Sequence, residues 1–308
     1  MIDSTSQVNV QQIQDPVKKI LARYKHAKTI KDQWTSVFEE CYEYALPQRE
    51  SFFSETPGRR RTDHIFDETA VVGVQEFASR LQSGIVPNYA RWAEFVAGSE
   101  IPKEQQKETN LVLDEITEYV FEVLQNSNFS QEVHETFLDI ALGTGVLLVE
   151  EGDAVQPVRF KAIPLPQVCL TSGHDDKVDA VYRTRKMKLK ELMFAYSKPI
   201  LNDKMAMDME ANPDKEIKII ESVYRDYSQN KEEVNIFCAI AEEYEHKIYD
   251  EEYKGLGSNP YIVYRWSKCA GEVYGRGPLQ FALPAIKTSN LVVELILENA
   301  QMSISGMY

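Results

Sequence analysis

The sequence predicts an α+β protein, with helices in the N-terminal half, strands in the middle and one long helix at the C-terminal end. Three observations predict this class. Over residues 16–142 apolar side chains recur every three or four positions, which is the spacing of amphipathic helices. From about residue 146 to residue 266 short apolar or alternating runs are separated by turn residues, as in antiparallel strands. After Pro278 the helical spacing returns. Helices and strands segregated along the chain favour an α+β order.

Four helices are expected in the N-terminal half. The first covers residues 16–46, since Asp15 and Pro16 suit the N-cap and first helical positions and Pro47 cannot continue a helix. The others are expected at residues 67–84, 102–125 and 131–142. In the third helix we expect four apolar side chains to face inward, namely Leu111, Ile116, Val120 and Leu124.

The middle of the chain is expected to form an antiparallel sheet. The strongest strand patterns are short runs rich in β-branched and aromatic residues, at residues 159–170, 178–186, 217–226, 233–241, 246–249 and 261–266. Residues 189–196 suggest a short helix, and residues 249–253 a solvated hairpin end. The Met-rich, Pro-containing residues 199–215 are expected to form a mobile loop.

These elements divide the chain into four predicted regions. Residues 1–15 are polar and form a flexible arm, residues 16–155 a helical region, residues 156–270 a strand-rich region and residues 271–308 a long helix. The polar start lacks the pattern of a signal peptide. No apolar run reaches the roughly 20 residues that a membrane span needs.

Composition excludes some functions. The net charge of −14 argues against a protein that grips DNA phosphates through a basic face. It is compatible with a wall past which DNA slides, and equally with a charge that only aids solubility. The four cysteines are scattered without a CxxC pair, which indicates reduced thiols in a cytosol-like compartment.

The sequence motifs do not indicate catalysis, a cofactor or a metal site. There is no phosphate-binding GxxxxGK[ST] loop. Gly143-Thr-Gly145 is interpreted as the end of a helix, and Gly275-Arg-Gly277 as a tight turn before Pro278 at the first position of a helix. His174-Asp175-Asp176 offers fewer oxygen ligands than a hard metal ion needs, and is interpreted as a solvated turn.

Two charged segments are the candidate contact sites. Arg59, Arg60 and Arg61 are the densest basic cluster, and three readings stay open: ion pairs within or between subunits, contact with DNA, or solvated surface. Residues 103–153 hold twelve acids against Lys103 and Lys107. These acids are either a solvated face or a face that meets a basic neighbour or lines a pore; they are Glu104, Glu108, Asp114, Glu115, Glu118, Glu122, Glu132, Glu135, Asp139, Glu150, Glu151 and Asp153.

Three blocks of sequence, in order, carry a resemblance to a known family. The first spans residues 34–95 and reads W…Y-x-LP-x-R, then G-x-R-R-x-x-x-IFD-x-TA, then SG-x-x-P…RW. The second is FKAIPLPQVCL…G…VDAVYRTRKM, and the third, residues 259–290, reads P…RW…GE-x-YGRGP…ALP-x-IK-x-x-N. Together they resemble the portal, or head-to-tail connector, proteins of short-tailed, podovirus-type bacteriophages.

The resemblance implies a structural protein without catalytic activity or cofactor. Members form a ring, usually a dodecamer, at one capsid vertex, and the ring is the channel for genome packaging and ejection. Implied partners are the terminase, capsid and scaffold proteins, a tail adaptor and double-stranded DNA that passes without sequence-specific binding; no membrane is implied. The implied location is the head–tail junction of the virion, after assembly in the host cytoplasm.

The same resemblance implies a role within the portal subunit for each predicted region of the chain. The helical region would be wing-like, residues 156–270 part of the wing or the tail-facing clip, and residues 271–308 stem-like. Family members continue beyond this helix, so the C-terminal portion of the family is expected to be absent here. Two alternatives stay open: another structural virion protein such as a tail adaptor, which the strand-rich middle disfavours, and an unrecognised hydrolase.

Overall fold

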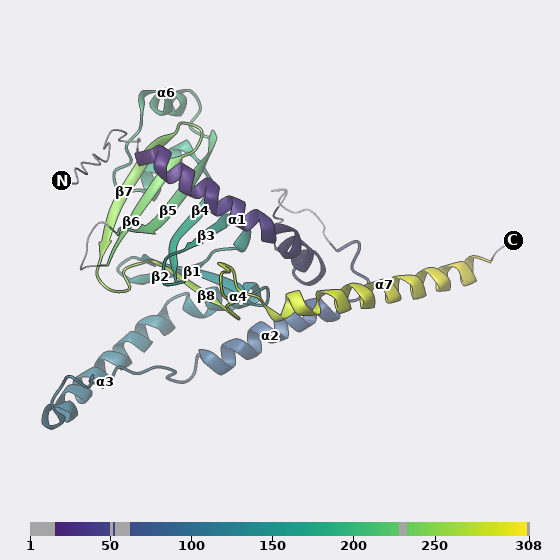
Figure 1. Cartoon of the computed structure of the whole chain (residues 1–308), viewed down its shortest axis with the longest axis horizontal. Coiled ribbons are helices and arrows are strands. Elements are labelled where there is room, and N and C mark those ends of the chain that lie inside the picture. The colour runs from purple at the N-terminus through teal and green to yellow at the C-terminus, as the bar shows by residue number, and fades with distance from the viewer. Residues whose placement is uncertain (1–15, 50–51, 53–61, 228–232, 307–308) are drawn as a thin grey trace, which may run out of the picture. The chain divides into compact units, whose positions relative to one another are not determined.

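The computed structural model describes residues 16–49, 52, 62–227 and 233–306 (Figure 1). The chain forms two compact units. Unit 1 takes the residues up to 31 together with 169–173 and 179–258, and unit 2 takes 32–168, 174–178 and 259–308. Helix α1 (Pro16–Ala45) contributes its first half to unit 1 and its second half to unit 2. The predicted α+β class is confirmed.

Unit 1 is built on a five-stranded sheet. Its order is β3-β4-β5-β6-β7, so each strand pairs with its neighbours in the sequence. The strands are β3 (Val168–Ser172), β4 (Val178–Lys188), β5 (Glu216–Arg225), β6 (Val234–Ala241) and β7 (His246–Lys254). The pairs from β4 to β7 are antiparallel. The predicted solvated hairpin end at residues 249–253 is therefore wrong, because these residues continue strand β7.

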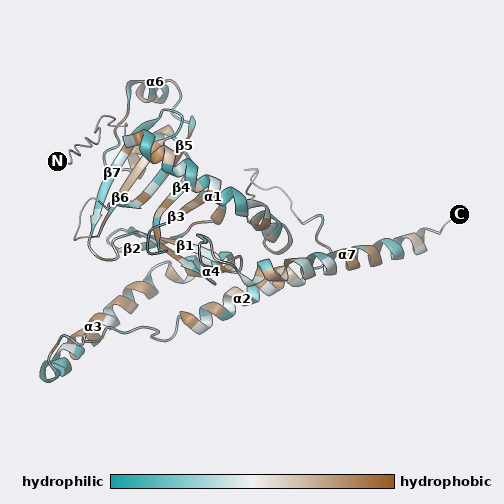
Figure 2. Ribbon diagram, in the orientation of Figure 1, coloured by the Kyte–Doolittle hydropathy of each residue, from teal (hydrophilic) through white to brown (hydrophobic). Residues whose placement is uncertain are grey.

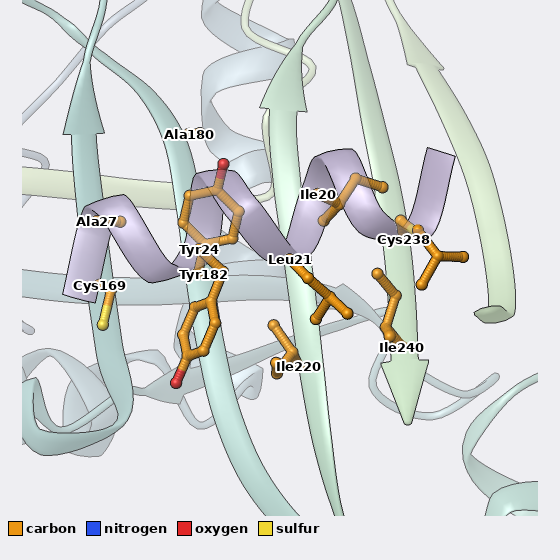
Figure 3. Packing of buried hydrophobic residues seen from close by; sticks show 11 residues of the cluster. Ile20, Leu21, Tyr24, Ala27, Cys169, Ala180, Tyr182, Ile220, Cys238 and Ile240 are labelled. Carbon is orange, nitrogen blue, oxygen red and sulfur yellow. The ribbon is translucent and has the colours of Figure 1, made fainter. Parts of the chain in front are cut away.

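Both faces of this sheet are buried. Because successive side chains of a strand point to opposite faces, Ile220 and Ile219 belong to different clusters. One face carries the first half of α1, whose Ile20, Leu21 and Tyr24 pack over the strands (Figure 3). The other face is covered by the short helices η2 (Leu189–Glu191), α5 (Leu192–Ala195) and α6 (Asp203–Ala211).

Helix α6 corrects the expectation of a mobile loop at residues 199–215. The Asn202 side chain caps the helix, since its Oδ1 accepts a hydrogen bond from the Met205 amide at 2.8 Å. Met205 is fully buried against the sheet. Met205 and Met209, two of the methionines that suggested a flexible segment, instead supply apolar contacts that fix it, while Met207 stays exposed.

Unit 2 combines a small sheet with helices. Its strands are β1 (Thr144–Glu151), β2 (Val158–Ala162) and β8 (Tyr261–Arg265), antiparallel in the order β2-β1-β8, and η1 (Leu165–Gln167) follows β2. Its helices, besides the second half of α1, are α2 (Thr69–Ile85), α3 (Lys103–Asn126), α4 (Phe129–Ile140) and α7 (Pro278–Ser305). The four helices predicted in the N-terminal half are present, with boundaries within about two residues of those expected, and the C-terminal helix begins at Pro278 within the predicted region 271–308.

All four cysteines lie in the described part of the chain and are free thiols. Burial raises the pKa of Cys41 and of Cys238 to about 12. Within the same part of the chain, no helix is both long and apolar enough to cross a bilayer.

Candidate assembly surface

The start of α7 is fixed by a close approach of two glycine segments. Gly143 has φ +127°, and a Cβ there would lie 2.2 Å from the Gly275 carbonyl oxygen. A Cβ on Gly277 would lie 2.1 Å from the Ala141 oxygen. The Gly277 amide instead donates to Leu142 O at 3.0 Å. Gly277 precedes Pro278 at the first helical position, as predicted, so the two glycine motifs serve to pack backbone against backbone.

A buried amide then holds α7 to the segment before α2. Asn290 is 6% exposed, and its Oδ1 accepts hydrogen bonds from the amides of Phe66 at 2.7 Å and Asp67 at 3.1 Å. Its Nδ2 donates to the His64 carbonyl at 2.9 Å. Asp67 also accepts hydrogen bonds from Ser289 and from the Thr69 amide. The IFD-x-TA block and the IK-x-x-N block, more than 200 residues apart in the sequence, therefore form one contact.

Beside this contact, α2 and α7 enclose an apolar groove of about 450 Å³. Gly73, Val74 and Phe77 line it from α2, and Ala282 and Ile286 from α7. Small residues keep the groove open, since nothing lies within 4 Å of a Cβ built on Gly73. The groove can accept apolar side chains from outside the unit.

Beyond Asn290, α7 has no buried side chain as far as residue 306. Large apolar side chains nevertheless continue along it, and the hydrophobic colour recurs along this part of α7 (Figure 2). The most exposed of them are Leu291, Val292, Leu295, Ile296, Leu297, Met302 and Ile304, with exposed fractions from 48% to 87%. An isolated helix of this length is marginally stable in water, and this one shows an apolar surface on several sides. This part of α7 is therefore a candidate surface for contact with another chain.

Helix α3 shows a second exposed apolar strip. We expected Leu111 and Ile116 to face inward, and this is wrong: they are 64% and 44% exposed. The buried side chains are Thr117 and Phe121, on the opposite side of the helix. The pattern identified an amphipathic helix, but α3 carries apolar residues on two sides and only one is covered within the chain. Val112, Ile116 and Tyr119, at i, i+4 and i+7, share the uncovered side.

The segment after α2 is anchored on α3 by the Arg91-Trp92 pair of the first block. Arg91 donates to Asp114 at 2.8 Å and also binds Glu118. Trp92 packs edge-on against Phe121, with ring centroids 5.4 Å apart. The Phe95 amide donates to Thr117 Oγ1 at 3.1 Å. This segment covers one side of α3 and leaves the apolar strip open.

The twelve acids of residues 103–153 divide into two groups. Six have partners in unit 2: Asp114 and Glu118 with Arg91, Glu135 and Asp139 with Arg49, Glu132 with the Ala162 amide, and Asp153 with Arg159 and two amides. The other six lie exposed; they are Glu104, Glu108, Glu115, Glu122, Glu150 and Glu151. The members of this second group are exposed and form no ion pair within the described residues, so they are the acids most open to a neighbouring molecule or a pore.

Asp139 is the member that least resembles a solvated acid. It is 2% exposed, accepts a hydrogen bond from Tyr42 OH at 2.8 Å, and lies 3.4 Å from Arg49 Nε. Burial raises its pKa to about 6, although Arg49 and Tyr42 act in the opposite direction. Arg49 also pairs with Glu135 at 2.9 Å. The arginine of the Y-x-LP-x-R motif therefore joins the end of α1 to α4.

Unit 1 contains a second buried charge cluster, which sequence reasoning missed. Glu221 on β5 is 4% exposed and lies opposite Arg183 on β4. It pairs with Arg185 at 2.6 Å and accepts a hydrogen bond from Tyr196 OH at 2.7 Å. The only available signal was the alternation of arginines in VDAVYRTRK. Because the buried Glu221 carboxylate is paired with Arg183 and Arg185, a role in holding β4 to β5 suffices to explain these buried charges.

The remaining candidates are the arginine cluster and the turn at residues 174–176. Arg59, Arg60 and Arg61 lie outside the described residues. His174, Asp175 and Asp176 form a turn, where Asp175 lies 3.7 Å from Lys177 and Asp176 lies 3.4 Å from Lys268. Among the residues that the structure describes, no group of histidine, cysteine and acidic side chains is placed to hold a metal ion.

Comparison with known proteins identifies the family. The family model described as "Bacteriophage head to tail connecting protein" matches residues 17–308. The chain belongs to this family. The match spans all three blocks that carried the resemblance, and it includes α2, α3 and α7.

A curated relative of this connector-family chain is named "Probable portal protein" and comes from Bordetella phage BPP-1. The two are 19% identical over 288 residues, which covers 88% of this chain and 50% of the relative. The chain thus spans half the length of that relative.

Proposed function

We propose that the chain is the subunit of a bacteriophage portal, a ring at the head–tail junction that serves genome packaging and ejection. Family membership and the relative named as a probable portal protein support this role. The structural observation that carries the proposal is the uncovered apolar surface of α7, α3 and the α2–α7 groove. Copies of the chain would bury these surfaces against one another around a central channel.

The finer assignments belong to the same proposal. The ring would be a dodecamer in the virion, assembled in the host cytoplasm, with terminase, capsid and scaffold proteins and a tail adaptor as partners. Double-stranded DNA would pass through the ring. The helices of residues 16–155 would be wing-like, residues 156–270 part of the wing or the clip, and residues 271–308 stem-like. The protein would act structurally and not as an enzyme, in keeping with the structural role of its family.

Sedimentation and negative-stain microscopy of the purified full-length protein test the proposal. We expect closed rings with an axial hole. The variant Ile296→Glu should shift the protein towards monomers, because it places a charge on the apolar face of α7. Glu298→Gln, on the same exposed part of α7, is the matched control and should assemble normally.

Circular dichroism separates assembly from folding. Ile296 has no buried contact within the chain, so the monomeric variant should keep its helix and strand content. Wild-type protein that stays monomeric at all concentrations, or turnover of nucleotide or DNA by the pure protein, would contradict the proposed function.

A further inference from the structure

The first half of α1 carries a row of cations that the proposed interface does not use. Residues 16–31 contain six lysines and arginines and no acid, in a chain of net charge −14. The apolar side of this half-helix is buried on the sheet of unit 1 (Figure 3). Its solvent side presents Lys18, Lys19, Arg23, Lys25 and Lys28, all exposed. We call these five residues the cationic face.

Nothing within the described residues neutralises the cationic face. No ion pair joins any of its five members to a carboxylate of the described chain. Arg23 lies over the Tyr224 ring, 5.5 Å from its centroid, which keeps the guanidinium on the surface of the unit. Like charges at i and i+3 or i+4, such as Lys19 with Arg23 and Lys25 with Lys28, destabilise a helix. The repulsion among these cations therefore destabilises the helix, and an anion bound from outside would relieve it.

The chemistry of the face favours phosphate over a protein surface. Its exposed positions hold cations and small or polar residues, Ala22, His26 and Thr29, and no large apolar side chain. The cores of protein interfaces are enriched in aromatic residues and depleted of lysine. This is the reverse of α7 and α3, whose exposed surfaces are apolar. A charged face without an apolar centre suits the backbone of a nucleic acid, which is held by charge alone.

The dimensions agree with this ligand. Lys18 and Lys28 are ten residues apart, so the cationic face extends about 15 Å along the helix axis at 1.5 Å per residue. Duplex DNA advances about 3.4 Å per base pair, so the length of the cationic face matches that of four or five base pairs. The acids elsewhere in the chain are screened beyond a Debye length of about 8–10 Å at physiological salt, so the net charge does not cancel the local attraction.

We propose that the cationic face of α1 contacts the phosphate backbone of duplex DNA without reading its sequence. The biological setting rests on the proposed function, because a portal has DNA passing through it. The contact itself is a property of the folded chain and is measurable apart from ring formation.

The test is the salt dependence of binding to a fluorescent 20-base-pair duplex, measured by anisotropy with the full-length protein. With about four phosphates neutralised, affinity should fall about 100-fold between 50 and 200 mM salt. A second duplex of unrelated sequence should bind equally well. The variant Lys18→Gln/Lys19→Gln/Lys25→Gln/Lys28→Gln should bind at least about 10-fold more weakly and lose most of the salt dependence of binding. It leaves Arg23 and its contact with Tyr224 intact.

The matched control removes four exposed lysines elsewhere: Lys103→Gln/Lys107→Gln/Lys177→Gln/Lys198→Gln. It has the same net charge as the test variant, so equal loss of binding in both would show a general charge effect and overturn the proposal. Absence of wild-type binding at 50 mM salt would also overturn it.

Sedimentation of the same samples keeps the two proposals separate. If the α1 variant loses ring formation but keeps DNA binding, the face meets another copy of the chain and the DNA proposal fails. If rings are absent throughout while DNA binding follows the α1 lysines, the proposed function fails alone.

Discussion

The two units differ in how completely they bury their apolar surface. In unit 1 the five-stranded sheet is covered on both faces, by α1 on one side and by α5 and α6 on the other. In unit 2, α2, α3 and α7 keep large apolar side chains exposed after the chain has folded. Unit 1 leaves only scattered apolar side chains exposed, such as Phe194 and Leu256, whereas the exposed apolar side chains of unit 2 follow its long helices. Under the proposed function, the contacts between copies would lie on the helices of unit 2, and the sheet of unit 1 would contribute internal stability.

The largest expected effect is at the glycine contact that fixes α7. Gly143→Ala should destabilise unit 2 by about 4 kcal/mol, since a positive φ and a Cβ 2.2 Å from a carbonyl oxygen add backbone strain to overpacking. Gly73→Ala, in α2 with open space around it, is the control and should be neutral or stabilising by up to about 1 kcal/mol. Urea denaturation followed by circular dichroism measures both. Equal effects of the two substitutions would mean that the close packing of Gly143 against Gly275 and Gly277 of the YGRGP motif does not matter for stability.

The next effect compares the two units directly. Ile220→Ala in the core of unit 1 should cost about 2–5 kcal/mol of unfolding free energy, because it leaves a cavity under α1. Ile296→Ala on α7 should change the stability of the monomer by less than about 0.5 kcal/mol but weaken assembly. Denaturation of dilute monomer and sedimentation at high concentration separate the two outcomes. A large loss of monomer stability in Ile296→Ala would mean that the end of α7 is already packed within the chain.

The third effect is a pH dependence caused by Asp139. Its folded pKa of about 6 is above its ordinary value, so the native state holds the proton more tightly than the unfolded chain. This contribution to stability is present at low pH and is lost as the pH rises through about 6. Relative to Asp139→Asn, the wild type should lose about 2 kcal/mol between pH 4.5 and 7. Parallel thermal or urea unfolding of the two proteins across this range measures it, and a pH-independent difference would contradict the raised pKa.

Local patterns sufficed to predict most of the elements. The start of α1 at Pro16 and its end before Pro47 follow from backbone chemistry, and the strands follow from alternation. Helix α6 was missed because a capping asparagine and a buried methionine in a short polar segment give a weak signal. The inward direction assigned to Leu111 and Ile116 was wrong because periodicity shows which side of a helix is apolar, but not whether the same chain covers it.

The candidate site was predictable only in part. The blocks around Asp67 and Asn290 were singled out, but their contact through one buried amide depends on tertiary structure. The same holds for Gly143 and Gly275. They were interpreted as a helix end and a tight turn, although the two segments pack against each other. The acids were treated as one group because the sequence does not distinguish the buried Asp139 from exposed Glu115.

Hydrogen exchange of monomer and assembled protein, compared peptide by peptide, tests the central claim most directly. If the uncovered helices of unit 2 form the contacts between copies, residues 291–305 of α7 and 111–119 of α3 should exchange quickly in the monomer and slow markedly on assembly. Residues 217–223 of β5 should be protected equally in both states. Assembled protein in which α7 and α3 exchange as fast as in the monomer would contradict the account.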